Sequence, residues 1–171
     1  MWNKATARAM VCGWALLVMP SAALAQGHQA GQGFMALRVG ANLVGNTYKV
    51  RDTKPVPGGG GSLGAFLSPT WALEFEAWVR ASNPECCLSR GRETLYSLSV
   101  VRLYARTGVQ PYALGGLTLL RSRGNQMQVQ VGVGAQVPVF HRLAMAIDLR
   151  GNGGGATMIV RPTIAAIYYF R

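Results

Sequence analysis

The sequence has few acidic residues, few cysteines and no long apolar run after its first residues. It contains 6 Asp and Glu against 17 Lys and Arg, and 3 Cys, in 171 residues. After residue 25 no segment has the ~18 consecutive apolar residues that indicate a membrane-spanning helix. Long segments with a helical hydrophobic period are missing too. The sequence therefore argues against both a helical membrane protein and a helical bundle.

The first 25 residues have the three parts of a secretory signal peptide. Lys4 and Arg8 are basic, residues 9–19 are apolar, and Ala23-Leu24-Ala25 is a small-x-small cleavage site. An uncleaved membrane anchor is the alternative, but the apolar run is shorter than the ~20 residues of a spanning helix. The expected divisions are a signal peptide (1–25), a short N-terminal periplasmic segment (26–33) and one domain (34–171).

Two adjacent cysteines, Cys86 and Cys87, follow the signal peptide. An exported chain meets an oxidising compartment in which thiols pair. Neighbouring cysteines either close a strained ring with each other or pair with another chain. They cannot supply a zinc site alone, and the glycine runs 58–61 and 153–155 open no helix that could bind phosphate. We read the first run as a strand entry and the second as a loop tip, and we expect neither metal nor cofactor.

Short segments in which apolar and polar residues alternate fill the rest of the chain. In the last of them, Val160, Pro162, Ile164, Ala166, Tyr168 and Phe170 share one face, and Arg161 and Thr163 lie on the other. Successive strand residues point to opposite sides, so one face can meet lipid while the other meets a polar interior. Each segment has roughly the ten residues of a tilted membrane-spanning strand. Eight segments alternate, at about 34–44, 58–67, 71–80, 94–106, 109–120, 127–137, 141–150 and 159–170.

The connections between these segments alternate in length. The first, third and fifth (44–57, 81–93 and 121–126) are longer than the intervening 68–70, 106–108 and 138–140. Outer-membrane barrels have short periplasmic turns and longer outer loops. With an even number of strands, both ends of the domain return to the periplasmic side. The expected fold is an all-β, eight-stranded antiparallel up-and-down transmembrane β-barrel.

The layout resembles the small eight-stranded outer-membrane β-barrels, in particular the membrane domain of the OmpA and OmpX group. The resemblance covers nearly all of residues 34–170 and depends on the strand pattern and the terminal Tyr168-x-Phe170. It implies a location in the bacterial outer membrane, and it implies that Tyr168 and Phe170 are the signal that the barrel-assembly machinery reads. In this chain Arg171 follows the aromatic residue, which departs from the family pattern.

Charged residues on the polar faces predict a network that closes the lumen. Eight strands leave an interior just wide enough for side chains to fill, and charges there must be paired or hydrated. Glu74 and Glu76 could also be read as a catalytic pair, but structural filling is the favoured interpretation. The expected network is Arg38, Glu74, Glu76, Arg80, Arg142, Asp148, Arg150 and Arg161.

The outer loops are expected to carry most of the remaining cations. Guanidinium groups suit phosphate, so these side chains are candidates for contacts with lipopolysaccharide or another anion, against the alternative of a solvated basic surface. Export argues against nucleic acid, and we expect a monomer in contact with outer-membrane lipid. The loop candidates are Lys49, Arg51, Lys54, Arg90, Arg92, Arg121 and Arg123.

Two other functions fit parts of the sequence. A secreted or periplasmic lipocalin-like barrel would bind an apolar ligand, with its apolar faces turned inward. A lipid A-modifying barrel enzyme would need a base, and His141 is the only plausible one. His141 is predicted beside a periplasmic turn, on the wrong side for outer-leaflet lipid A. We therefore predict a structural, adhesive or surface-interaction role, no enzyme activity and no catalytic residue.

Overall fold

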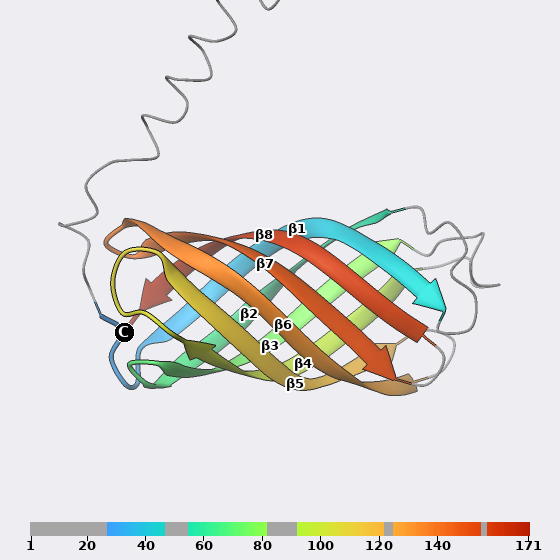
Figure 1. Cartoon of the computed structure of the whole chain (residues 1–171), viewed down its shortest axis with the longest axis horizontal. Coiled ribbons are helices and arrows are strands. Elements are labelled where there is room, and N and C mark those ends of the chain that lie inside the picture. Colours follow the sequence, from blue (N-terminus) through green and yellow to red (C-terminus); the bar gives the residue numbers. More distant parts are fainter. Residues whose placement is uncertain (1–26, 47–54, 82–91, 122–124, 155–156) are drawn as a thin grey trace, which may run out of the picture.

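The protein is a barrel of eight tilted strands (Figure 1). The computed structural model describes residues 27–46, 55–81, 92–121, 125–154 and 157–171. The strands are β1 (Gly33–Asn46), β2 (Val56–Ser68), β3 (Trp71–Ala81), β4 (Arg92–Leu103), β5 (Gln110–Arg121), β6 (Asn125–Phe140), β7 (Leu143–Gly154) and β8 (Thr157–Phe170). Each strand pairs antiparallel with the next, and β1 pairs with β8 to close the barrel. The predicted fold class is confirmed.

The barrel has its apolar side chains outside and its polar side chains inside. On β6, Val129, Val131 and Val133 are each about 60% exposed, whereas the alternating Gln128 and Gln130 are buried. The two faces of β8 divide in the same way, as the sequence predicted. A wide apolar outer surface of this kind is stable when lipid covers it. It argues against the lipocalin-like alternative, which needs the opposite orientation.

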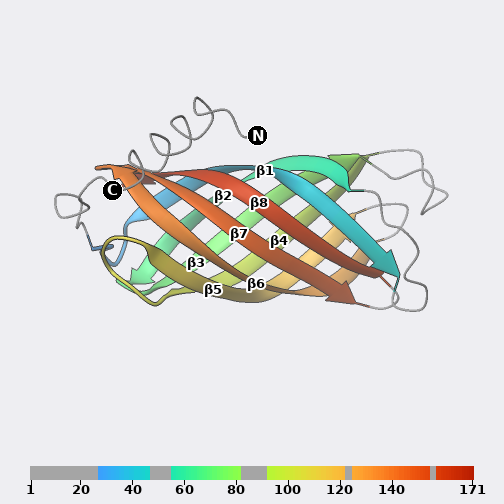
Figure 2. The ribbon, with the colours of Figure 1, turned by 45° about the horizontal axis from the view of Figure 1, so that its top comes forward.

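The two ends of the barrel differ in their connections. At one end, which we call the terminal end, lie residues 27–32, the short connections 69–70, 104–109 and 141–142, and Arg171. At the other, the loop end, the strands β1, β3, β5 and β7 end. The strand tilt is also visible in Figure 2. Among the described residues, no helix is long and apolar enough to cross a membrane.

The first glycine run lies at the start of β2, as the strand-entry interpretation expected, whereas the loop-tip interpretation of the second run is corrected. Gly58–Gly61 belong to β2 and pair with both β1 and β3. A Cβ at Gly60 would be 2.1 Å from the carbonyl oxygen of Ala77, so the glycine permits close approach of the two strands. Gly153 and Gly154 end β7 instead of forming a loop tip.

The orientation of β4, which the sequence left ambiguous, is settled by its register. Ser97 and Ser99 are buried in the lumen, and Arg102 is exposed on the outer surface. The guanidinium of Arg102 lies over the ring of Trp71, 5.0 Å from its centroid, and 5.6 Å from that of Tyr104. Aromatic and cationic side chains of this kind are typical of a membrane interface. The outer surface near this end of the barrel therefore combines aromatic side chains with an arginine.

Candidate functional site

The middle of the lumen is filled by six charged side chains from four strands. β3 supplies Glu74 and Glu76, and β7 supplies Asp148 and Arg150. Arg38 comes from β1 and Arg161 from β8. Alternation places these side chains on the inner face of their strands, and each is at most 7% exposed.

Glu74 lies between two guanidinium groups. Its Oε1 is 2.6 Å from Nη2 of Arg38, and its Oε2 is 3.1 Å from Nη2 of Arg150. Ser62 on β2 accepts a hydrogen bond from Nη1 of Arg38 at 3.3 Å. Contacts from β1 and β7 therefore hold the Glu74 carboxylate, and Ser62 on β2 helps to hold its partner Arg38.

Glu76 is paired in the same way with a second set of partners. Its Oε2 is 2.9 Å from Nη2 of Arg161 and 3.3 Å from Nη1 of Arg150. The Arg161 guanidinium lies 5.0 Å from the ring centroid of Trp78, which is fully buried on β3. This cation–π contact covers the face of the guanidinium that the carboxylate leaves open.

Asp148 joins the network to neutral donors. Tyr112 on β5 donates a hydrogen bond to its Oδ2 at 2.8 Å, and Thr163 on β8 donates one to its Oδ1. Nη2 of Arg150 lies 3.2 Å from the same Oδ2. The carboxylate thus accepts bonds from three strands.

The network is electrically balanced. Three carboxylates, of Glu74, Glu76 and Asp148, face three guanidinium groups, of Arg38, Arg150 and Arg161. Charges buried in this way persist only when each is paired and hydrogen-bonded, because the loss of one partner leaves an uncompensated charge. The six side chains fill the middle of the lumen and are buried from solvent.

Toward the loop end the lumen is filled by a separate ion pair and by neutral polar groups. Arg80 on β3 pairs with Glu93 on β4. Ser97, Thr118 and Gln130 form a hydrogen-bonded chain across β4, β5 and β6, with O···O distances of 2.8 Å. These charged and neutral side chains therefore contact one another across the lumen between the central network and the loop end.

The terminal end of the lumen is capped by His28, in the segment before β1. Its ring stacks on Phe66 at a centroid distance of 4.1 Å, and Nε2 lies 3.0 Å from Oε1 of Gln110. Backbone hydrogen bonds between this segment and Phe66 fix it across the barrel mouth. Burial lowers the pKa of His28 below its ordinary value of 6.5, although hydrogen bonds to the side-chain oxygens of Gln110 and Gln32 oppose the shift. The cap therefore favours a neutral imidazole.

The structure places seven of the eight predicted network residues in the lumen. The prediction was wrong for Arg142, which lies exposed in the turn between β6 and β7, because β7 begins only at Leu143. Arg80 is in the lumen but pairs with Glu93, away from the central network. Sequence reasoning missed Tyr112, Trp78 and Thr163, although all three occupy inward positions in the alternating pattern.

Most of the other predicted site residues lie outside the described ranges. These are Lys49, Arg51, Lys54, Arg90, Arg123, Cys86 and Cys87. Arg92 begins β4, and Arg121 ends β5 as an exposed side chain at the loop end. At the other end of the barrel, Tyr168 is exposed and Phe170 half-buried on the lipid-facing side of β8.

No side-chain cluster in the described ranges suits a metal ion. Those ranges hold no group of three or more His, Cys, Asp or Glu in a suitable arrangement. His141 is exposed in the turn between β6 and β7, at the terminal end.

These features define a closed, eight-stranded transmembrane β-barrel with a charge-filled lumen. The chain has the fold of the small eight-stranded outer-membrane β-barrels. It is similar to Neisserial surface protein A, with a TM-score of 0.66 and 12% identity over 82% of this chain and 99% of that one. It is also similar to the N-terminal β-barrel domain of Pseudomonas aeruginosa OprF, with a TM-score of 0.60 and 17% identity over 82% of this chain and 99% of that one.

A third similar structure is Ail, the attachment invasion locus protein of Yersinia pestis. It gives a TM-score of 0.57 and 13% identity, covering 83% of this chain and 100% of that one. No family model matches the sequence, and no curated protein matches it. The shared feature is therefore the fold.

Proposed function

We propose that this protein is a non-conducting outer-membrane barrel that anchors surface loops, with a structural, adhesive or surface-interaction role. The observation that carries the proposal is the filled lumen. The cavity between the central network and the terminal end, lined in part by Arg38, Glu74 and Tyr112, has a volume of about 30 Å³. That volume accommodates about one water molecule, so this part of the described lumen has no room for a solute.

The proposed location is the bacterial outer membrane, with the terminal end in the periplasm. Support comes from the exposed apolar belt, from the fold shared with outer-membrane barrels, and from the signal-peptide pattern of residues 1–25. The exposed ring of Tyr168 and the half-buried ring of Phe170 supply the C-terminal aromatic pattern that we propose as the assembly signal. We propose that the barrel acts as a monomer, because a closed barrel leaves no strand edge to pair.

Conductance tests the closed lumen directly. In planar lipid bilayers we expect the wild-type protein to show no stepwise currents. Replacing both Glu74 and Glu76 with alanine removes two of the three carboxylates of the network, and we expect ion leak or a lower unfolding temperature. Arg121→Gln, at an exposed position on β5, is the control. Stepwise wild-type currents of a size typical of open porins would contradict the proposal.

The loops are the proposed site of interaction, with anionic groups such as the phosphates of lipopolysaccharide as partners. The sequence places Lys49, Arg51 and Lys54 in the connection after β1 and Arg90 in that after β3. Among proteins of similar fold, Ail has been crystallised with the heparin analogue sucrose octasulfate. Glutamine substitutions at these four cations should reduce lipopolysaccharide co-purification. An unchanged amount would remove the loops as the binding surface.

A further inference from the structure

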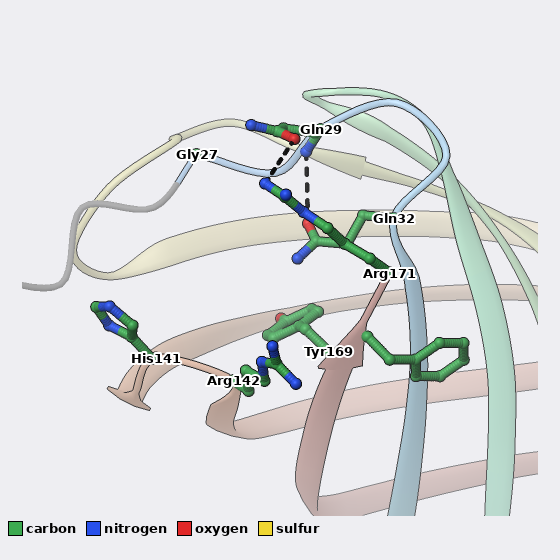
Figure 3. A pocket seen from close by; sticks show the side chains of 8 residues that line it. Gly27, Gln29, Gln32, His141, Arg142, Tyr169 and Arg171 are labelled. Carbon is green, nitrogen blue, oxygen red and sulfur yellow. Dashed lines mark hydrogen bonds between the residues drawn. The ribbon is translucent and has the colours of Figure 1, made fainter.

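The terminal end holds a polar pocket that the proposed function does not use. Its volume is about 450 Å³, within the usual range for small-molecule sites. His141, Arg142 and Arg171 line it together with Gln29 and Gln32 (Figure 3). The three basic side chains come from the turn between β6 and β7 and from the residue after β8.

The geometry of the two arginines is set by neighbouring contacts. Nη2 of Arg171 donates a hydrogen bond to Oε1 of Gln29 at 3.2 Å. The carbonyl oxygen of Arg142 accepts a hydrogen bond from the backbone nitrogen of Tyr169 at 2.8 Å. The Arg142 contact involves only its backbone, and the Arg171 contact uses one of the five N–H donors of its guanidinium.

No acidic side chain opposes these cations at the terminal end. The four described carboxylates, of Glu74, Glu76, Glu93 and Asp148, are all buried in the lumen. The connections 69–70, 104–109 and 141–142 and the segment 27–32 contain neither Asp nor Glu. The pocket is therefore lined by two exposed guanidinium groups with no carboxylate side chain beside them. Guanidinium binds phosphate through paired N–H donors.

The apolar outer surface continues to the edge of this pocket. Phe140, next to His141, is 66% exposed, and Tyr168, two residues before Phe170, is 40% exposed. A lipid whose acyl chains lie along this surface would bring its phosphate to the level of Arg142 and Arg171. A soluble anion would gain the charge contact but not the apolar one.

We propose that this pocket binds the phosphate headgroup of an anionic phospholipid from the membrane leaflet at the terminal end. A headgroup with net negative charge fits better than a zwitterionic one, because a choline or ethanolamine cation would meet the same arginines. The inference rests on the proposed membrane location. It goes beyond that proposal by assigning a lipid site on the side opposite the surface loops.

The test compares phosphatidylglycerol with phosphatidylcholine of the same acyl chains. The protein is purified in non-ionic detergent, each lipid is added, and bound lipid is counted by native mass spectrometry. We expect the wild type to bind more phosphatidylglycerol than phosphatidylcholine. In the Arg142→Gln/Arg171→Gln variant, the ratio of bound phosphatidylglycerol to bound phosphatidylcholine should fall at least about fivefold. The matched control is Arg102→Gln/Arg106→Gln, which removes the same charge at the same end from residues that do not line the pocket.

Three results would contradict the proposed lipid site. An equal loss in both double variants would mean diffuse attraction to a basic rim. Displacement of the lipid by an equal concentration of glycerol phosphate would mean a site for free anions. Equal retention of both lipids by the wild type would mean no headgroup selectivity. Before lipid is added, unboiled and boiled samples are compared by electrophoresis. A missing mobility shift there would count against the membrane barrel itself, separately from the pocket.

Discussion

Arg150 on β7 contacts Glu74 on β3 across the lumen, with its Nη2 3.1 Å from Oε2 of the carboxylate. In the closed order of strands, β3 and β7 are four strands apart in either direction, so the pair connects opposite walls of the barrel. The backbone hydrogen bonds of a barrel run only between neighbouring strands. The ion pair therefore supplies a contact that the backbone cannot.

Removal of this contact should destabilise the barrel strongly. Glu74→Gln leaves Arg38 and Arg150 without one of their carboxylates, and we expect a loss of about 3–5 kcal/mol in the free energy of unfolding. The measurement is urea unfolding in lipid vesicles. Arg121→Gln, at an exposed position, should change the value by less than about 0.5 kcal/mol. Equal stability of the two variants would show that the network is not needed for stability.

Two adjacent glycines on β5 should respond differently to alanine. A Cβ at Gly116 would be 2.1 Å from the carbonyl oxygen of Leu98 on β4, whereas one at Gly115 meets nothing closer than 4.0 Å. We expect Gly116→Ala to lower the free energy of unfolding by about 1–3 kcal/mol and Gly115→Ala to leave it unchanged. The same unfolding assay checks both. A reversed order would mean that the β4–β5 spacing differs from that described.

A charged substitution on the lipid-facing surface should destabilise the barrel more, the deeper its position lies in the bilayer. Val131 on β6 is 60% exposed and lies between Gly115 and Gly151 of the neighbouring strands. In a bilayer, Val131→Arg should lower the free energy of unfolding by about 2–4 kcal/mol, and Val109→Arg, at the terminal end, should lower it by about 0–1 kcal/mol. Comparison of their folding in vesicles tests the membrane position of the belt. Equal and small costs would contradict it.

The His28 cap should weaken in acid. Burial holds the pKa of His28 below the value of 6.5 in the unfolded chain. The unfolded state therefore binds more protons near and below pH 6.5, so the stabilisation is complete above that pH and decreases as the pH falls. We expect the difference in stability between pH 7.5 and 5.5 to be smaller in His28→Phe, which keeps an aromatic ring on Phe66. A larger pH effect in that variant would contradict the cap.

The fold could be predicted from the sequence because alternation is a local property. The inward positions of Arg38, Glu74 and Arg161 follow from counting residues along one strand. The partners do not, because they depend on the register between strands and on which walls face each other. The pairing of Arg80 with Glu93 illustrates this limit: Glu93 was assigned to a loop, since the sequence pattern did not show β4 beginning at Arg92.

The ends of the barrel were harder to predict for another reason. Arg142 continues the polar phase of its segment, but a turn of two residues places it outside the lumen. His28 precedes all strands, and its neighbours Phe66, Gln110 and Gln136 come from distant parts of the chain. No short pattern marks such a position. A single buried histidine beside glutamines gives no motif, and only the closed structure brings these residues together.

The position of His28 also ties the segment before β1 to four strands of the closed barrel. Its ring contacts Phe66 on β2, Gln110 on β5, Gln136 on β6 and Tyr169 on β8. This set of neighbours comes into existence only when the last strand has joined the first. The complete set of His28 contacts is therefore a property of the closed barrel and of no single strand pair. A fluorescent or chemical label at this residue would report completion of the barrel, separately from the formation of individual strand pairs.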